Sequence, residues 1–126
     1  MNSSFNQLYN AAVNAQKILI TGPKFPDGDS IGACLALCFA FEQITSARID
    51  VFGELSFRYR WLPRADSFLK NTLVSKDYDL AVVLDGDRHR LPPEIHQPYH
   101  AAKKKVVIDH HASTNKDGYN ICIVSP

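Results

Sequence analysis

Short, almost wholly apolar runs that alternate with helical patterns are the feature of this sequence that most restricts its fold. The clearest run is Leu80–Leu84, and we also expect strands at Lys17–Thr21, Ile49–Phe52 and Val106–Ile108, with a fifth at Ile121–Val124. Strands that are apolar on both sides are typical of a parallel sheet with helices on both faces. The pattern therefore predicts an α/β fold of this kind.

Helical spacing of apolar residues predicts the segments between these strands. We expect helices over Ser3–Ala15 and Ser30–Ile44, and a shorter helical piece around Arg64–Asn71. Cys34 and Cys38 lie four residues apart in the second helix, so they share one of its faces. Since a zinc site would need more ligands nearby, we interpret both cysteines as small core residues.

Composition indicates one globular domain and gives little information about partners. The chain has 126 residues, of which 45% are hydrophobic and 21% charged, with a formal net charge of +1. That charge provides no electrostatic footprint for nucleic acid or an anionic membrane. No apolar stretch approaches the roughly 20 residues of a membrane span, and no signal peptide is apparent. With three cysteines and no framework spacing, we expect a cytoplasmic protein without a membrane partner.

Polar clusters follow three of the predicted strands. Asp27 and Asp29 come after the first strand and a five-residue loop, Asp85 closes the third strand, and the run Asp109–His111 closes the fourth. Ligands bind outside the carboxyl ends of strands in open parallel sheets, so these groups are expected to meet in one crevice. Carboxylates brought together repel each other unless a cation lies between them. Carboxylate and imidazole ligands suit Mn²⁺, Mg²⁺ or Zn²⁺, and a pair of such ions would support phosphoryl-transfer chemistry.

Simpler structural explanations exist for part of this pattern. The segment from Pro26 to Asp29 also fits a turn in which Asp29 or Ser30 caps the following helix, and Asp85 with Gly86 fits a turn after a strand. The adjacent histidines after Asp109 have no comparable structural explanation. Three clusters at three predicted strand ends therefore favour a functional site over coincidence.

The remaining histidines and lysines favour solvent-exposed roles. His96 and His100 would share a helix face, but Pro92, Pro93 and Pro98 surround them and predict a solvated loop instead. We expect His89 to face solvent as well. The run Lys103–Lys105 is expected to be a solvated loop or helix end.

Three motifs together resemble those of the DHH phosphoesterase superfamily. They are Ile18–Gly32, which contains Pro26-Asp-Gly-Asp29, then Val82–Asp85, and finally Val107–Asn115, which contains the Asp-His-His signature. The similarity runs from about Lys17 onward and is nearest to the oligoribonuclease and phosphoadenosine-phosphate phosphatase branch. The resemblance implies the N-terminal, Rossmann-like domain of such an enzyme over residues 1–126.

The resemblance also implies a role for each motif residue. Asp27 would ligate a first metal ion and Asp29 a second, while Asp85 would bridge both. His110 would ligate the second ion and His111 would contact the substrate phosphate, so that Asp85, His110 and His111 form the catalytic group. Asp109 would orient the two histidines.

The sequence departs from the family pattern at two places. The first motif of the family begins with a histidine whose counterpart here is Pro23, and proline cannot ligate a metal. The fourth motif, a later Asp, and the C-terminal substrate domain have no counterpart before Pro126. Each expected ion therefore lacks one protein ligand, although Mg²⁺ and Mn²⁺ accept water in place of protein groups.

Two functions remain open at this point. The first is a phosphoesterase, dependent on Mn²⁺ or Mg²⁺, that hydrolyses a small nucleotide, an oligonucleotide or a polyphosphate-type substrate by a two-metal mechanism. Short single-stranded nucleic acid and self-association as a homo-oligomer are compatible with it. The alternative is a non-catalytic binding or scaffold domain, which Pro23 and the missing fourth motif favour. A Rossmann-type dinucleotide module is disfavoured because Gly22, Gly28 and Gly32 do not have the required spacing.

Overall fold

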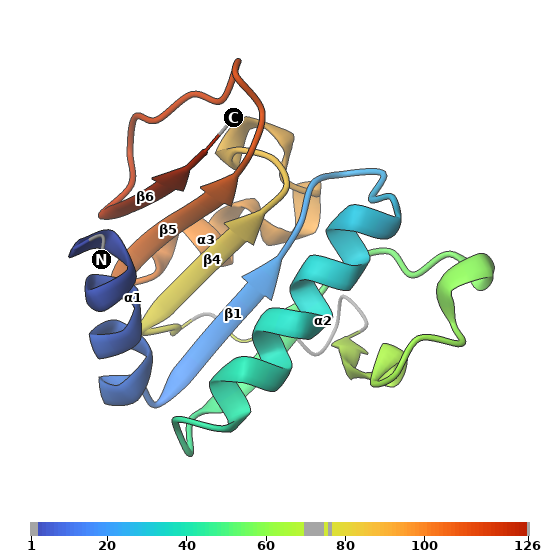
Figure 1. Ribbon diagram of the computed structural model, residues 1–126, viewed down its shortest axis with the longest axis horizontal. Coiled ribbons are helices and arrows are strands. Elements are labelled where there is room, and N and C mark those ends of the chain that lie inside the picture. The colour runs from blue at the N-terminus through green and yellow to red at the C-terminus, as the bar shows by residue number, and fades with distance from the viewer. Residues whose placement is uncertain (1–2, 70–74, 76, 126) are drawn as a thin grey trace.

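A computed structural model describes residues 3–69, 75 and 77–125, and its centre is a six-stranded sheet in the order β3-β2-β1-β4-β5-β6. All five strand pairs are parallel (Figure 1). The strands are β1 (Lys17–Thr21), β2 (Arg48–Phe52), β3 (Phe68–Leu69), β4 (Leu80–Leu84), β5 (Lys104–Asp109) and β6 (Ile121–Val124). The predicted α/β class with a parallel sheet is confirmed.

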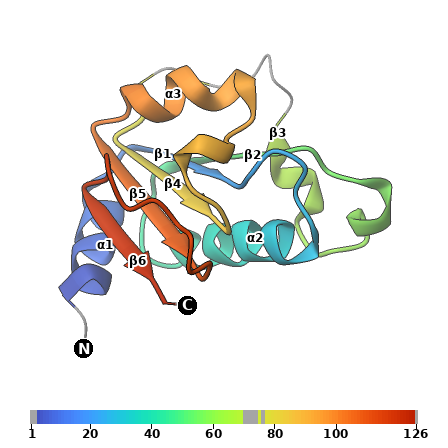
Figure 2. The same cartoon turned by 90° about the horizontal axis from the view of Figure 1, so that it is seen from above.

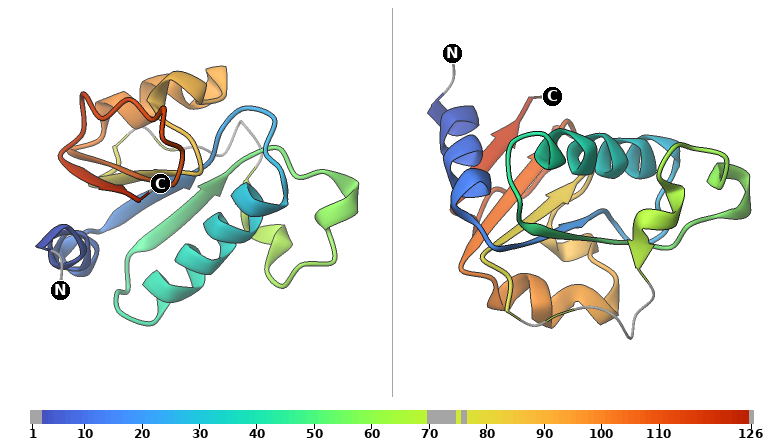
Figure 3. Two further views of the ribbon diagram at one scale, coloured as in Figure 1. Left: turned by 45° about the horizontal axis from the view of Figure 1, so that its top comes forward. Right: turned by 90° about the horizontal axis from the view of Figure 1, so that it is seen from below.

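Helices cover both faces of the sheet, as the apolar strands require. The helices α1 (Ser3–Asn14) and α2 (Gly28–Glu42) pack on one face, and α3 (His96–Ala101) packs on the other (Figure 2). Short 3₁₀ turns occupy Phe57–Tyr59, Ala65–Ser67, Arg88–Arg90 and Pro93–Ile95. The segment between β2 and β3 projects beyond α2 at the edge of the molecule (Figure 3). None of the helices in the described ranges is long and apolar enough to cross a membrane.

The core has two layers because neighbouring residues of a strand point to opposite faces. In β4, Leu80, Val82 and Leu84 pack toward α1 and α2, whereas Ala81 and Val83 pack toward α3. The all-apolar β4 is therefore buried along its whole length, which explains its continuous hydrophobic run.

Cys34 and Cys38 are buried between α2 and the sheet, which confirms them as core residues. Burial raises the pKa of the Cys34 thiol to about 12, so this thiol stays protonated at neutral pH.

Helix α2 begins where Asp27 can cap it. The backbone of Asp27 is extended, and its carboxylate accepts a hydrogen bond from the amide of Ser30 at 3.0 Å. This contact satisfies one of the amides that the first turn leaves unpaired. The alternative interpretation of this segment as a simple turn placed the cap at Asp29 or Ser30, and the structure places it at Asp27.

The strand predictions at β1, β4 and β6 agree with the observed bounds. The backbone structure was predicted wrongly at three other places: Arg64–Asn71, Lys103–Lys105 and the histidine pair His96 and His100. The piece expected to be helical around Arg64–Asn71 is a 3₁₀ turn followed by β3, and its last two residues lie outside the described part of the chain. Two of the residues in Lys103–Lys105 belong to β5, because Lys104 and Lys105 pair with Leu80 and Ala81. Backbone pairing with β4 outweighs the preference of these charged residues for a loop or helix end.

The backbone structure around the histidine pair on α3 was predicted wrongly, although both histidines are exposed as expected. His96 and His100 lie on a regular helix with their rings stacked at a centroid distance of 6.0 Å. Pro98 lies in the first turn of this helix, where the missing amide hydrogen has no helical partner to lose. The prolines thus mark the start of α3 and do not exclude it.

The strand order reverses direction between β1 and β4. From β1 the chain moves to β2 and β3 on one side, and from β4 it moves to β5 and β6 on the other. Ligands of open α/β sheets bind in the crevice at this switch point, outside the carboxyl ends of the strands. The ends of β1, β4 and β5 are therefore the place where a functional site is expected.

Candidate metal centre

Sheet register brings the acidic residues of two strands together. Leu84 pairs with Ile108 across β4 and β5, and the amide of Asp85 donates to the carbonyl of Ile108 at 3.0 Å. Asp85 and Asp109 are the next residues of these two strands, so they emerge side by side at the carboxyl edge of the sheet. The prediction that these strand ends converge is confirmed.

Asp85 has a constrained backbone and two polar side-chain partners. Its φ of 60° lies in the left-handed region, which Asp tolerates better than most residues but which still costs free energy. Its Oδ1 lies 2.8 Å from His110 Nε2, and its Oδ2 accepts from the Ser30 hydroxyl at 2.7 Å. The side chain is only 10% exposed, so both carboxylate oxygens are directed into the site.

Asp109 is buried beneath the two histidines and holds them in place. Its Oδ1 lies 2.7 Å from His111 Nδ1 and accepts from the His110 amide at 2.8 Å, while its Oδ2 accepts from the Thr114 hydroxyl. Burial would raise the pKa of Asp109, but the hydrogen bonds from Thr114, His110 and His111 outweigh it and keep the pKa below its ordinary value. A carboxylate accepts at His111 Nδ1, so that nitrogen carries the proton and Nε2 is left for an ion or a substrate.

Four residues offer ligand atoms that lie within 4.8 Å of one another: Asp85, Asp109, His110 and His111. The rings of His110 and His111 lie 4.3 Å apart between centroids, and both are partly exposed. Carboxylate oxygens and imidazole nitrogens at this spacing fit one divalent ion of the Mn²⁺ or Zn²⁺ type. Among the described residues, these four side chains are the group whose ligand atoms lie close enough together to hold a metal ion.

Asp27 reaches this centre indirectly, through Ser30. The Ser30 hydroxyl lies 3.1 Å from Asp27 Oδ1 and 2.7 Å from Asp85 Oδ2, so it links the two carboxylates. The hydrogen bond from the Ser30 amide is the main reason that the pKa of Asp27 is below its ordinary value. Asp27 is thus charged and close to Asp85, but one of its oxygens already serves as the helix cap.

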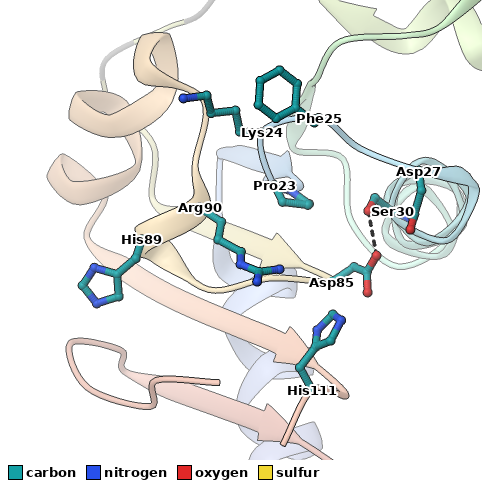
Figure 4. A pocket seen from close by; sticks show the side chains of 9 residues that line it. All are labelled: Pro23, Lys24, Phe25, Asp27, Ser30, Asp85, His89, Arg90 and His111. Carbon is teal, nitrogen blue, oxygen red and sulfur yellow. Dashed lines mark hydrogen bonds between the residues drawn. The ribbon is translucent and has the colours of Figure 1, made fainter. Parts of the chain in front are cut away.

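A pocket of about 430 Å³ opens beside these groups (Figure 4). The residues that line it come from the loop after β1, the start of α2, the turn after β4 and the end of β5: Pro23, Lys24, Phe25, Asp27, Ser30, Asp85, His89, Arg90 and His111. In Figure 4 the ring of His89 points away from the carboxylates, whereas Arg90 extends toward Asp85.

Asp29 lies on the other side of Asp85. It is exposed, and it lines a second pocket of about 380 Å³ together with Asp85, Asp109 and His110. Asp27 and Asp29 therefore flank the four-residue group without belonging to it. The predicted site residues come from the expected strand ends, while their role as ligands stays a prediction.

Four residues that shape the centre were not among the predicted site residues. Ser30 links two carboxylates, Thr114 holds Asp109, and Lys24 and Arg90 bring positive charge to the pocket. The Lys24 amide donates to the Arg90 carbonyl at 2.6 Å, which ties the loop after β1 to the turn after β4. Ser30 is adjacent to Asp29 and was recognisable as part of the first motif, whereas the position of Arg90 depends on the fold.

Position 23 does not fit a second ion of the kind that the resemblance implies. Pro23 is buried, and a Cβ added to Gly86 would lie 3.1 Å from the Pro23 Cβ. A proline ring offers neither a lone pair nor a hydrogen-bond donor to the pocket. The residues near Asp27 therefore provide fewer ligand atoms than the group around Asp85.

Comparisons with known proteins identify the family and the fold of the chain. A family model described as the DHH family, N-terminal domain, matches residues 17–126. A crystal structure of an exopolyphosphatase-related protein from Bacteroides fragilis has a TM-score of 0.84 and 24% sequence identity, with 98% of this chain and 39% of that chain covered. The chain thus spans about two-fifths of the length of that protein, and the likeness is one of fold. No curated protein matches the chain.

Proposed function

This chain belongs to the DHH family, and we propose that it is a metal-dependent phosphoesterase domain whose reaction centre lies at the carboxyl ends of β1, β4 and β5. The observation that carries the proposal is the convergence of Asp85, Asp109, His110 and His111 within 4.8 Å at the switch point of the sheet. The exopolyphosphatase-related protein of similar fold is consistent with a phosphorylated substrate. We propose Mn²⁺ or Mg²⁺ as the ion.

Each residue of the centre has a chemical role in this proposal. A divalent ion bound here would lower the pKa of a bound water and polarise a phosphoryl oxygen. Asp85 Oδ1 and His110 Nε2, which are 2.8 Å apart, would both ligate that ion, with Nε2 in its unprotonated form. Asp109 fixes the tautomer of His111, whose free Nε2 faces the pocket side where a phosphate would lie. Lys24 and Arg90 add positive charge that attracts an anionic substrate.

The substrate class that we propose is a small phosphorylated molecule, a nucleotide or a short single-stranded oligonucleotide. A pocket of about 430 Å³ that is lined by Lys24, Arg90 and His111 suits a phosphate group with a small attached moiety. We further propose that residues 1–126 act as the N-terminal, metal-holding domain of such an enzyme in the cytoplasm. Association with a second copy remains compatible with this proposal.

Substitution of Asp85 by Asn tests the proposed function. Asn tolerates a φ of 60°, so the fold should persist, but it removes the charge that would hold the ion. We expect Mn²⁺-dependent hydrolysis of p-nitrophenyl phosphate or its diester to fall on the order of 10³-fold, as for loss of a central electrostatic group.

Asp66→Asn is the matched control, because Asp66 is an exposed carboxylate that lines neither pocket of the centre. The variant should hydrolyse these esters at the rate of the unsubstituted protein. Equal rates in the Asp85→Asn variant, or no Mn²⁺-dependent hydrolysis in any protein, would favour a non-catalytic scaffold domain, the alternative that Pro23 supports.

A further inference from the structure

Arg90 brings a guanidinium into the pocket that contains Asp27, Asp85 and His111. Its side chain is exposed and extends toward Asp85 (Figure 4). Across the described ranges of the chain, this guanidinium forms no ion pair with a carboxylate. A guanidinium stays protonated at any physiological pH, so the pocket carries a permanent positive charge.

The other arginines that follow β2 and β4 have partners elsewhere. Arg64 pairs with a glutamate of α2, and Arg88 donates to a backbone carbonyl in the loop before β6. Arg58 and Arg60 lie over aromatic rings in the segment that projects beyond α2. Arg90 is therefore the arginine among these five that is placed to meet a ligand of the centre.

The side of the pocket nearest Arg90 is poor in metal ligands. Pro23 stands where the family pattern has a histidine, and Asp27 Oδ1 already accepts hydrogen bonds from the Ser30 amide and hydroxyl. The same Ser30 hydroxyl contacts Asp85 Oδ2 at 2.7 Å, so a proton donor stands between the two carboxylates that a first ion would join.

The positive charge of Arg90 and the shortage of ligand atoms both disfavour a second metal ion at this position. A fixed positive charge repels a divalent cation in a partly buried pocket, and it lowers the need for one because it offsets the charge of the carboxylates. A guanidinium also presents paired donors that match the oxygens of a phosphate.

We propose that this domain holds one divalent ion, at Asp85 and His110 with their neighbours, and that Arg90 replaces the second ion as the positive group that binds the substrate phosphate. The inference rests on the proposed phosphoesterase function and departs from the two-ion arrangement that the family resemblance implies. It accounts for Pro23, which would be a defect in a two-ion centre and is compatible with a centre of one ion and one arginine.

The number of ions bound is the first test. Calorimetric titration of the full chain with Mn²⁺ should give one ion per chain. Combining Pro23→His with Arg90→Ala restores the missing ligand and removes the competing charge, so this double variant should bind two. Two ions on the unsubstituted chain would overturn the inference and leave the proposed function in place. No Mn²⁺ binding by the unsubstituted chain would overturn both.

Binding of inorganic phosphate is the second test, and it isolates Arg90. In the presence of saturating Mn²⁺, Arg90→Ala should weaken phosphate binding at least tenfold, since a charge-assisted pair is lost. Its affinity for Mn²⁺ should be unchanged or higher, because a repelling charge is removed. Arg90→Lys should recover part of the phosphate affinity, as a point charge without the paired geometry.

Arg60→Ala is the control, because Arg60 is an exposed arginine outside the pocket. Phosphate binding by Arg90→Ala at the strength of this control would overturn the role of Arg90. Weaker Mn²⁺ binding by Arg90→Ala would do the same, since it would mean that Arg90 supports the ion and does not replace one.

Discussion

The two ends of the sheet carry similar charged residues in opposite arrangements. At the amino ends of the strands, carboxylates pair with cations: Lys17 Nζ lies 2.8 Å from Asp77, Lys103 Nζ lies 3.1 Å from Asp79, and Arg48 Nε lies 3.0 Å from Asp50. At the carboxyl ends, no Asp of the described centre forms an ion pair with Lys or Arg. Its carboxylates contact histidines and hydroxyls instead.

This difference separates carboxylates that stabilise the fold from carboxylates that are available to a ligand. A carboxylate with a lysine or arginine partner is already neutralised, and its removal leaves an unmatched charge or donor in the protein. Carboxylates that lie close together with only histidines between them are stabilised by an added cation, so they remain available to bind one. Asp85, whose φ of 60° is strained, lies at the carboxyl ends of the strands. Strained residues are expected at functional sites.

The largest effect on stability should come from Asp50 near the amino ends. Asp50 is 3% exposed and accepts from the Tyr78 hydroxyl at 2.7 Å as well as from Arg48. Asp50→Ala leaves the buried Tyr78 hydroxyl without this acceptor, so we expect a loss of about 2–3 kcal/mol in the free energy of unfolding. Urea denaturation measures this change.

The double variant with Tyr78→Phe sharpens this experiment. Removing both partners deletes the unsatisfied hydroxyl, so the double variant should be more stable than Asp50→Ala alone. Mn²⁺ binding should be unaffected in both variants. A large loss of Mn²⁺ affinity after either change would break the division between the two ends of the sheet.

The fold was predictable from the sequence where burial alone determines the structure. β4 and β1 are flanked by strands on both sides and covered by helices, so β4 is apolar throughout, β1 is apolar from Ile18 to Ile20, and their bounds could be read directly. The start of β5 was missed because Lys104 and Lys105 belong to it by pairing with β4, and backbone pairing leaves no mark on side-chain polarity.

The candidate site was predictable to a similar degree and for a similar reason. Asp85 and Asp109 follow apolar strands directly, so their convergence required only the parallel sheet. Ser30 contacts Asp85, which is 55 residues away in the chain, and Arg90 lines the pocket from the turn after β4; a motif carries no information on either position. Asp27 was correctly placed near Asp85, but its role as the cap of α2 required the backbone geometry.

Asp109 resembles Asp50 in being buried and hydrogen-bonded, but it also positions a residue of the centre. Asp109→Asn replaces one acceptor oxygen by a donor that opposes the proton on His111 Nδ1 or the Thr114 hydroxyl. We expect Mn²⁺ affinity to fall 10–100-fold, the range for residues that orient metal ligands, with a loss of about 1 kcal/mol in the free energy of unfolding.

Thr114→Val is the matched change for Asp109, since it removes a hydrogen bond to the same carboxylate without reversing any donor. Its effect on Mn²⁺ affinity, measured by the same calorimetric titration, should be smaller than that of Asp109→Asn. Unchanged Mn²⁺ affinity in Asp109→Asn would show that His111 does not need this partner, and the centre would then resemble the amino ends more closely than we argue.

Asp79 at the amino ends should give the smallest effect and a distinctive pH dependence. Its Oδ2 accepts from the amides of Gln16 and Lys17 at 2.8 and 3.0 Å, and these bonds are the main reason that its pKa is below the ordinary value. Asp79→Ala should cost about 1 kcal/mol of unfolding free energy at pH 7, like the loss of a helix cap. Because the folded pKa is depressed, this stabilisation is present above the ordinary Asp pKa and is lost as pH falls through the folded value. Thermal unfolding of the two proteins should therefore differ by a constant amount from pH 7 to about 5 and converge below about 4. A difference that persists undiminished at the lowest pH would mean that Asp79 stabilises the fold by packing, and that the charge pairing at the amino ends contributes less than its geometry indicates.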